Sequence, residues 1–143
     1  PSPHTVRVLL GHPLALALAI QDRMDDALRV MRAVAAESDA LFPAVHPSRA
    51  TVDNDLALLL ALSGEAADAR QRAASALAAR RESGDEDAAL AQADLIIDVL
   101  DCRVRKDAAL RERVAGDLAR VLADPRLLSA LGDLYRKLAQ ACR

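Results

Sequence analysis

Histidine and cysteine are the residue types in this chain that most often bind metals or take part in catalysis. The chain of 143 residues has three histidines: His4, His12 and His46. No two of them have the three- or four-residue spacing that brings two ligands onto one helix face. His12 and His46 each precede a proline, at positions where helices are expected to start. We therefore expect no metal ion and no other cofactor.

The two cysteines are Cys102 and Cys142. Arg103, Arg105 and Lys106 follow Cys102, and positive neighbours favour the reactive thiolate form. No histidine or second cysteine lies near Cys102 in the sequence, and the chain has no G-x-S-x-G, H-E-x-x-H or glycine-rich phosphate-binding motif. We therefore expect that the chain is not an enzyme. We also expect two small, reduced and buried thiols in a cytoplasmic protein.

The composition favours helices and argues against several classes of partner. Hydrophobic residues make up 52% of the chain and aromatic residues only 1%, namely Phe42 and Tyr135. Alanine and leucine dominate instead, and both are strong helix formers. The net charge of −2, with arginines and acidic residues interleaved, predicts no nucleic-acid binding. The apolar run 9–20 is interrupted at Gly11–Pro13 and is shorter than the roughly 20 residues that span a membrane, which predicts no membrane partner.

Apolar residues recur at helical spacing almost throughout the chain and predict seven helices with short connectors and no strand. At the last boundary, Asp124 is expected to be the N-cap and Pro125 the first helical residue. The expected helices are 3–20 with a bend or restart at Gly11–Pro13, 24–40, 47 to the Ser63–Gly64 break, 65–82, a fifth ending near 102, 107–123 and a last one from 125.

The sequence also repeats itself. The residues of 14–19 are echoed by those of 56–61, which is a shift of 42, and Ala27 meets Ala69 at the same shift. A third, degenerate copy at a shift of 39 aligns Ala69 with Ala108. Periods of 20–50 residues in a helical chain indicate stacked helix pairs, because one pair cannot bury its apolar face alone. We expect each of these alanines to lie where two helices cross closely.

The residues of 21–28 (Gln-Asp-Arg-Met-Asp-Asp-Ala-Leu) resemble the tetratricopeptide turn L-G-x-Y-E-E-A-L, and those of 63–69 resemble it too. The 42-residue period and the pair His46–Pro47 resemble the longer kinesin-light-chain-type repeats. The resemblance implies an all-α, tetratricopeptide-like α-solenoid of antiparallel helix pairs in a single domain, 1–143. Its repeats would be about 3–42, 45–83 and 85–123, followed by a C-terminal capping helix, 124–143.

The resemblance implies an interaction module that binds a protein or peptide in a concave groove lined by the first helix of each pair. The polar groove positions would form an acidic strip suited to a basic or amide-rich peptide, although solvated helix faces give the same pattern. These partner-binding candidates are Arg49, Asp53, Asn54, Asp55, Gln92, Asp94 and Asp98. A chain that captures no peptide, and whose predicted groove is filled by its own residues, would argue against this interpretation.

Three alternatives remain open. In bacteria, such arrays are often attached to signalling ATPases, kinases or transcription regulators, so the chain is alternatively a regulatory segment that contacts its own parent chain. A helical enzyme of an unrecognised class is a further alternative. The apolar face of the last helix either caps the array or forms a weak homodimer, through Leu127, Leu131, Leu134, Tyr135 and Leu138.

Overall fold

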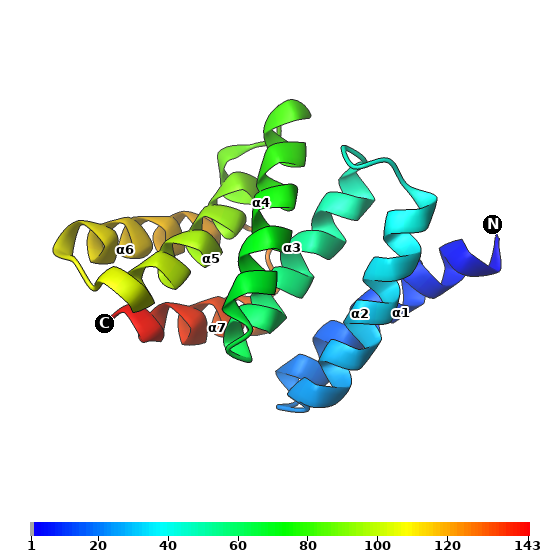
Figure 1. Ribbon diagram of the computed structural model, residues 1–143, viewed down its shortest axis with the longest axis horizontal. Helices are drawn as coiled ribbons and strands as arrows, with labels where there is room; N and C mark the ends of the chain where they lie inside the picture. Colours follow the sequence, from blue (N-terminus) through cyan, green and yellow to red (C-terminus); the bar gives the residue numbers. More distant parts are fainter. Residues whose placement is uncertain (1) are drawn as a thin grey trace.

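Seven α-helices and one short 3-10 helix account for most of the computed structural model, which describes residues 2–143 and has no strand within that range. The predicted all-α class is confirmed. The elements in Figure 1 are α1 (Pro3–Ile20), α2 (Met24–Leu41), α3 (Pro47–Leu62), α4 (Ala66–Glu82), α5 (Asp87–Arg105), α6 (Ala108–Ala123), α7 (Ser129–Ala139) and η1 (Gln140–Cys142).

Side chains cap the starts of three helices. The Ser2 hydroxyl oxygen accepts a hydrogen bond from the backbone N–H of Thr5 at the start of α1. The Nδ1 atom of His46 accepts one from Ser48 at the start of α3, and Asp107 accepts one from Leu110 at the start of α6. These bonds satisfy N–H groups that have no partner within the helix. The histidine before Pro47 is therefore an N-cap.

Two expected boundaries differ from the structure. Helix α1 continues without a break through Pro13, because the proline costs a single hydrogen bond and the helix has packing on both sides of it. The last helix begins at Ser129 and not at Pro125. The carboxylate of Asp124 accepts a hydrogen bond from the nearby N–H of Arg126 at 3.0 Å, and this bond closes a turn ahead of the helix.

The 42-residue shift relates the turns of the first two helix pairs. The N–H of Arg23 donates to the carbonyl of Leu18 at 2.9 Å, and Glu65 donates to Leu60 at the same distance. The backbone is left-handed in both turns, with φ of 62° at Asp22 and of 83° at Gly64.

The alanines near the start of the second helix of each pair are buried, as the repeat predicts, in two cases out of three. Ala27 and Ala69 are fully buried, as the shift of 42 predicts. Ala108 is exposed, so the prediction for the third copy is wrong. Asp107 is the N-cap of α6, which makes Ala108 the first helical residue, whereas Ala69 is the fourth residue of α4. Ala108 therefore precedes the buried part of α6, which begins at Leu110.

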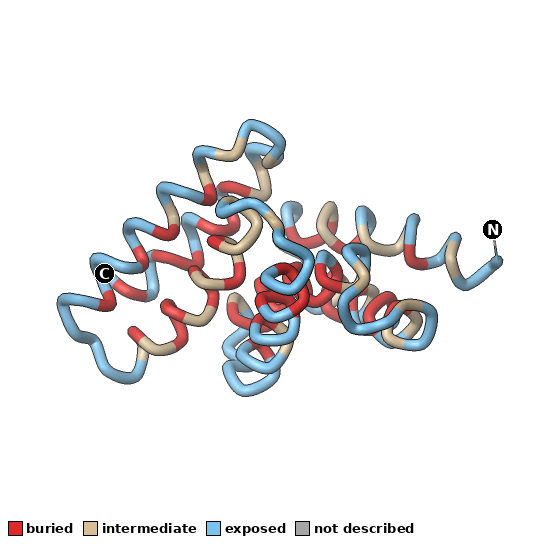
Figure 2. The backbone as a smooth tube through the Cα atoms, turned by 90° about the horizontal axis from the view of Figure 1, so that it is seen from above, coloured by how far each residue is buried: buried red, intermediate tan, exposed pale blue. Residues whose placement is uncertain are grey.

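Helix α3 lies at the centre of the fold. Consecutive helices pack side by side from α1 to α6, and α3 also contacts α1, α5 and α7. Ten consecutive residues of α3, 52–61, are buried, although ten residues cover all sides of a helix. Figure 2 shows this continuous buried stretch in the middle of the molecule, whereas the outer helices bury one side only.

Helix α7 runs back across the earlier part of the chain. It contacts α1, α3 and α5, which are the first helices of the three pairs, as well as α6. Figure 1 shows α7 passing below α5 toward the C-terminus. We refer to the surface of α1, α3 and α5 that α7 contacts as the inner wall.

The left-handed turn at Asp22 generates a stability prediction. Glycine adopts positive φ without the Cβ clash that other residues meet, so Asp22→Gly should raise the free energy of unfolding by about 0.5–1 kcal/mol. The Asp22 side chain is 91% exposed, so little contact is lost. The control is Asp25→Gly, in the first turn of α2, which should lower stability by a similar amount. Urea unfolding followed by circular dichroism measures both, and a destabilised Asp22→Gly variant would contradict the argument.

Candidate interaction surfaces

Three of the predicted groove residues are consecutive, and α3 points them in different directions. Asp53, Asn54 and Asp55 follow one another, and successive residues of a helix point about 100° apart. All three are buried, at 3%, 0% and 5% exposure. Each has a partner on a different neighbouring helix, so the three side chains do not lie in one strip.

Asp53 faces α4. Its carboxylate accepts a hydrogen bond at 2.7 Å from Arg72, which also binds Asp39 of α2. Burial raises the pKa of Asp53 above its ordinary value, although the Arg72 guanidinium opposes the shift. This group of charges joins α2, α3 and α4.

Asn54 faces α7 and α5. Its Nδ2 atom donates to the hydroxyl of Tyr135 at 2.8 Å and to Oε1 of Gln92 at 3.1 Å. Arg80, itself buried, donates to the backbone carbonyl of Ala89 at 2.7 Å and lies 3.4 Å from the same Gln92 oxygen. Burial and the nearby Asp55 raise the pKa of Tyr135 above its usual value, so its hydroxyl stays neutral. Helix α7 is thus held to α3 by a buried hydrogen bond.

Asp55 faces α1. Its Oδ2 atom lies 2.6 Å from Nε2 of His12, and the histidine side chain is 21% exposed. A buried carboxylate needs a partner of this kind, because desolvation of an isolated charge is costly. His12 therefore joins α1 to α3.

Asp98 of α5 faces α6. Its carboxylate accepts a hydrogen bond at 2.6 Å from Arg113, and Asp98 and Asp117 are each 4% exposed. Burial, followed by the neighbouring Asp117, raises the pKa of Asp98 to about 7, and Arg113 only partly offsets this shift. Two carboxyl groups in one buried place cannot both ionise easily, so Asp98 holds a proton up to near neutral pH.

The remaining candidates are only half-buried. Arg49 donates to the backbone carbonyl of Phe42 at 3.0 Å and pairs with Asp39 at 3.3 Å. Gln92 and Asp94 lie on α5. The structure therefore does not gather the seven candidates into one open strip, and most of them hold helices of the chain together. Their role in binding a partner stays a prediction.

The residues expected to form a homodimer lie on or near α7. Leu134, Tyr135 and Leu138 are buried at 8%, 0% and 0% exposure, whereas Leu127 and Leu131 are half-buried. Most of this apolar face is covered by the chain itself, so a dimer through it would first need α7 to leave the wall.

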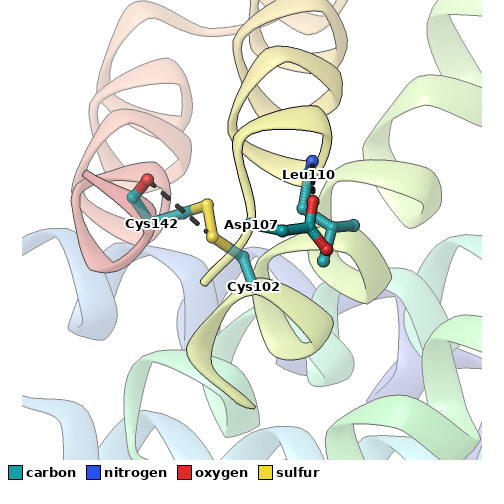
Figure 3. Close-up of a disulfide and its surroundings, with 4 residues drawn as sticks. All are labelled: Cys102, Asp107, Leu110 and Cys142. Atoms are coloured by element: carbon teal, nitrogen blue, oxygen red, sulfur yellow. Dashed lines mark hydrogen bonds between the residues drawn. A yellow bond between two sulfur atoms is a disulfide. The ribbon is translucent and has the colours of Figure 1, made fainter. Parts of the chain in front are cut away.

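The two cysteines form a disulfide, and the prediction of two separate thiols is wrong. Cys102 near the end of α5 is bonded to Cys142 in η1, and the two cysteines are 40 positions apart in the sequence, with Cα atoms 5.6 Å apart. Figure 3 shows the bond beside the Asp107 cap of α6. Sequence reasoning missed it because the distant Cys142 returns to α5 only once α7 has packed. Disulfides persist mainly in oxidising compartments, so the pairing removes the premise on which a cytoplasmic location was predicted.

A second surface lies between α1 and α2. A groove of about 470 Å³ has walls of apolar side chains and a rim that includes Arg7, Arg29 and Glu37. Helix α1 also has the length and apolar composition of a membrane-spanning helix, a test that core helices and signal sequences pass as well. The apolar walls are formed by Val6, Leu10, Leu14, Val30, Ala33 and Val34.

Sequence reasoning missed Tyr135, Arg80 and His12 as contact residues of the inner wall. The signal for Tyr135 was present, because it is the only tyrosine and lies on the apolar face of the last helix. A buried tyrosine hydroxyl usually finds a polar partner. Nothing in the sequence identifies Asn54, 81 residues away, as that partner.

The raised pKa of Asp98 predicts a pH dependence of stability. A folded-state pKa of about 7 lies above the ordinary 3.8, so the folded chain binds this proton more tightly than the unfolded chain does. The resulting stabilisation is complete below about pH 4 and is lost as the pH rises through 7. Asp98→Asn, which cannot ionise, should be more stable than the wild type at pH 8, by on the order of 1–3 kcal/mol, and not at pH 4. Urea unfolding at both pH values measures this. An equal stability difference between Asp98→Asn and the wild type at pH 4 and pH 8 would contradict the raised pKa of Asp98.

The disulfide closes a loop of about 40 residues and should stabilise the folded state by roughly 2–4 kcal/mol. Dithiothreitol should therefore lower the unfolding midpoint of the wild-type chain. The control is Cys102→Ser with Cys142→Ser, whose midpoint should already be low and should not respond to the reductant. The prediction would be contradicted if thiol titration showed full reduction and the unfolding midpoint of the wild type had not changed.

The geometry of both surfaces can be compared with that of known proteins. No protein-family model, no curated protein and no solved structure matches this chain. The chain's own contacts give two candidate surfaces: the inner wall, which α7 covers, and an uncovered apolar groove between α1 and α2.

Proposed function

We propose that this chain is a protein-interaction module, a tetratricopeptide-like array of antiparallel helix pairs whose inner wall binds an amphipathic helix. One observation carries the proposal. Helix α7 crosses α1, α3 and α5, the helices that line the binding groove in such arrays, and buries Tyr135 and Leu138 there. A wall that accepts a helix of its own chain has the shape and chemistry to accept one from a partner.

The contacts of α7 define what such a partner needs. Its apolar side supplies Leu134, Tyr135 and Leu138, at the spacing of one helix face. The hydroxyl of Tyr135 accepts a hydrogen bond from the Asn54 amide, so a partner helix without an acceptor at this position would lose one buried hydrogen bond. Arg136 and Lys137 are exposed on the other side of α7. The expected partner is therefore a helix with an apolar side, one central hydroxyl and a basic outer side.

In the present state the wall is filled, which argues against a groove that is permanently open. We propose that a partner must displace α7, and that the Cys102–Cys142 bond opposes this displacement. The same observation favours the second candidate, a regulatory segment of a larger signalling protein that contacts its own chain. Both candidates assign the chain a binding role and no catalysis.

The proposal is tested by opening the wall and offering α7 as a separate peptide. The probe is a fluorescent peptide of residues 127–142 with Cys142→Ser. In the chain, Leu138→Glu with Cys142→Ser puts a charge at a fully buried position and should release α7. Fluorescence anisotropy should show the peptide binding this variant at least tenfold more tightly than the wild type.

Two controls make the result specific. Leu128→Glu with Cys142→Ser changes a leucine that is 69% exposed, so α7 should stay in place and the peptide should not bind. A peptide with Tyr135→Phe should bind the open variant about threefold to tenfold more weakly, because one buried hydrogen bond is lost. An open variant that keeps its helical circular dichroism and fails to bind the peptide would show that the wall is not a helix-binding site.

A further inference from the structure

The groove between α1 and α2 is an uncovered apolar feature that the inner-wall proposal does not use. Leu10 and Leu14, one helical turn apart on α1, are 68% and 51% exposed. They face Val30 and Val34 of α2 across the groove. A Cβ atom on Gly11 would lie 2.5 Å from Val34 Cγ2, so the glycine permits a close crossing that fixes the spacing of the two walls.

The internal repeat identifies what borders a groove in this position. The same shift of 42 residues carries Leu14 to Leu56 and Arg29 to Gln71. Leu56 and Gln71 line the corresponding groove between α3 and α4. Helix α2 borders that groove: it packs on α3, and its Arg32, Ala36 and Asp39 complete the lining. The groove between α1 and α2 is therefore the equivalent position, and no helix among the described residues 2–143 borders it as α2 borders the second groove.

The charges around the groove between α3 and α4 show how α2 is recognised. Arg32 of α2 pairs with Glu65, the N-cap residue of α4, at 2.6 Å. Asp39, seven residues later, pairs with Arg49 at 3.3 Å and with Arg72 at 3.2 Å. One basic and one acidic residue, two turns apart, thus set the register of α2 on α3 and α4.

The same positions around the open groove carry a different charge pattern. Glu65 corresponds to Arg23, the N-cap residue of α2, so the charge is reversed. Arg49 corresponds to Arg7 and keeps its charge. Arg7 and Arg23 have nearby acidic partners, Glu37 and Asp26, but both arginine side chains are more than half exposed. Exposed pairs contribute little energy and exchange partners easily.

We propose that the groove between α1 and α2 docks an acidic amphipathic helix of another protein, lying as α2 lies on α3 and α4. The helix carries acidic residues at two positions seven apart, one against Arg23 and one against Arg7, and small apolar residues between them. Binding covers Leu10 and Leu14, and removal of this apolar area from water provides most of the affinity. This site is separate from the inner wall, so the proposal for the groove does not depend on the position of α7.

The probe follows from the repeat. It is a fluorescent peptide of residues 24–41, the α2 sequence, with Arg32→Glu to match Arg23, and with both ends blocked. The control peptide keeps Arg32, which would lie against Arg23. Anisotropy with the full chain should show about threefold to tenfold tighter binding of the Arg32→Glu peptide, because a like-charge contact with the exposed Arg23 becomes an opposite-charge pair. Arg23→Glu in the chain should reverse this preference, because the charge pair is then restored with the control peptide.

Variants of the chain locate the binding. Leu10→Glu and Leu14→Glu alter exposed residues, so folding is preserved, and each should weaken binding of the peptide at least tenfold. The matched control is Val104→Glu, on α5, where the valine is 83% exposed and the affinity should not change. Binding of the peptide with unchanged affinity to Leu10→Glu would place it elsewhere and overturn the proposal.

Two other occupants give distinct results that would also overturn it. A second copy of the chain would appear in light scattering as a dimer that Leu10→Glu dissociates, with no binding of the peptide. A membrane surface would appear as co-sedimentation with phosphatidylserine-containing vesicles that Leu10→Glu abolishes, again with no binding of the peptide. The α7 peptide and the Leu138→Glu variant play no part in these measurements, so failure here leaves the inner-wall proposal standing.

Discussion

The burial of α3 on every side is the constraint on which the other contacts depend. A helix with ten consecutive buried residues has no solvated face, yet this one carries Asp53, Asn54 and Asp55 within that stretch. Each buried polar group costs free energy unless it finds a partner. Arg72, Tyr135 and His12 supply those partners from α4, α7 and α1. The polar residues of α3 thereby specify which helices surround it, and the apolar residues supply the bulk of the burial.

Much of the fold could be predicted from the sequence because it depends on local signals. Helical periodicity and the capping residues define six of the seven helices to within a few residues. The shift of 42 predicts that Ala27 and Ala69 are equivalent, and both are fully buried. Prediction failed where one local signal had two solutions. Asp124 closes a turn with Arg126 although an Asp-Pro pair also suits a helix start, and Asp107 caps α6 although the repeat placed it inside the helix.

The candidate site was harder to predict because it depends on contacts between distant residues. The sequence identifies polar residues on the first helix of each pair, and the resemblance to tetratricopeptide repeats assigns them to a groove. Whether they meet solvent or another helix is decided by the packing of the neighbouring helices, including the path of α7 over Asn54, and no local pattern encodes that packing. The disulfide was missed for the same reason, since Cys142 reaches Cys102 only through that path. Side chains read as a solvated strip are consequently internal contacts.

The disulfide also changes what a break in the backbone would do. The bond between Cys102 and Cys142 joins both ends of a segment that contains α6, the connector and α7 into one covalent ring. Arg126 lies in the exposed part of the connector between α6 and α7, and trypsin cleaves peptide bonds that follow an exposed arginine. A cut there would leave the two fragments attached to each other, and they would separate on a denaturing gel only after reduction. Proteolytic nicking of this connector would therefore loosen α7 without letting it diffuse away.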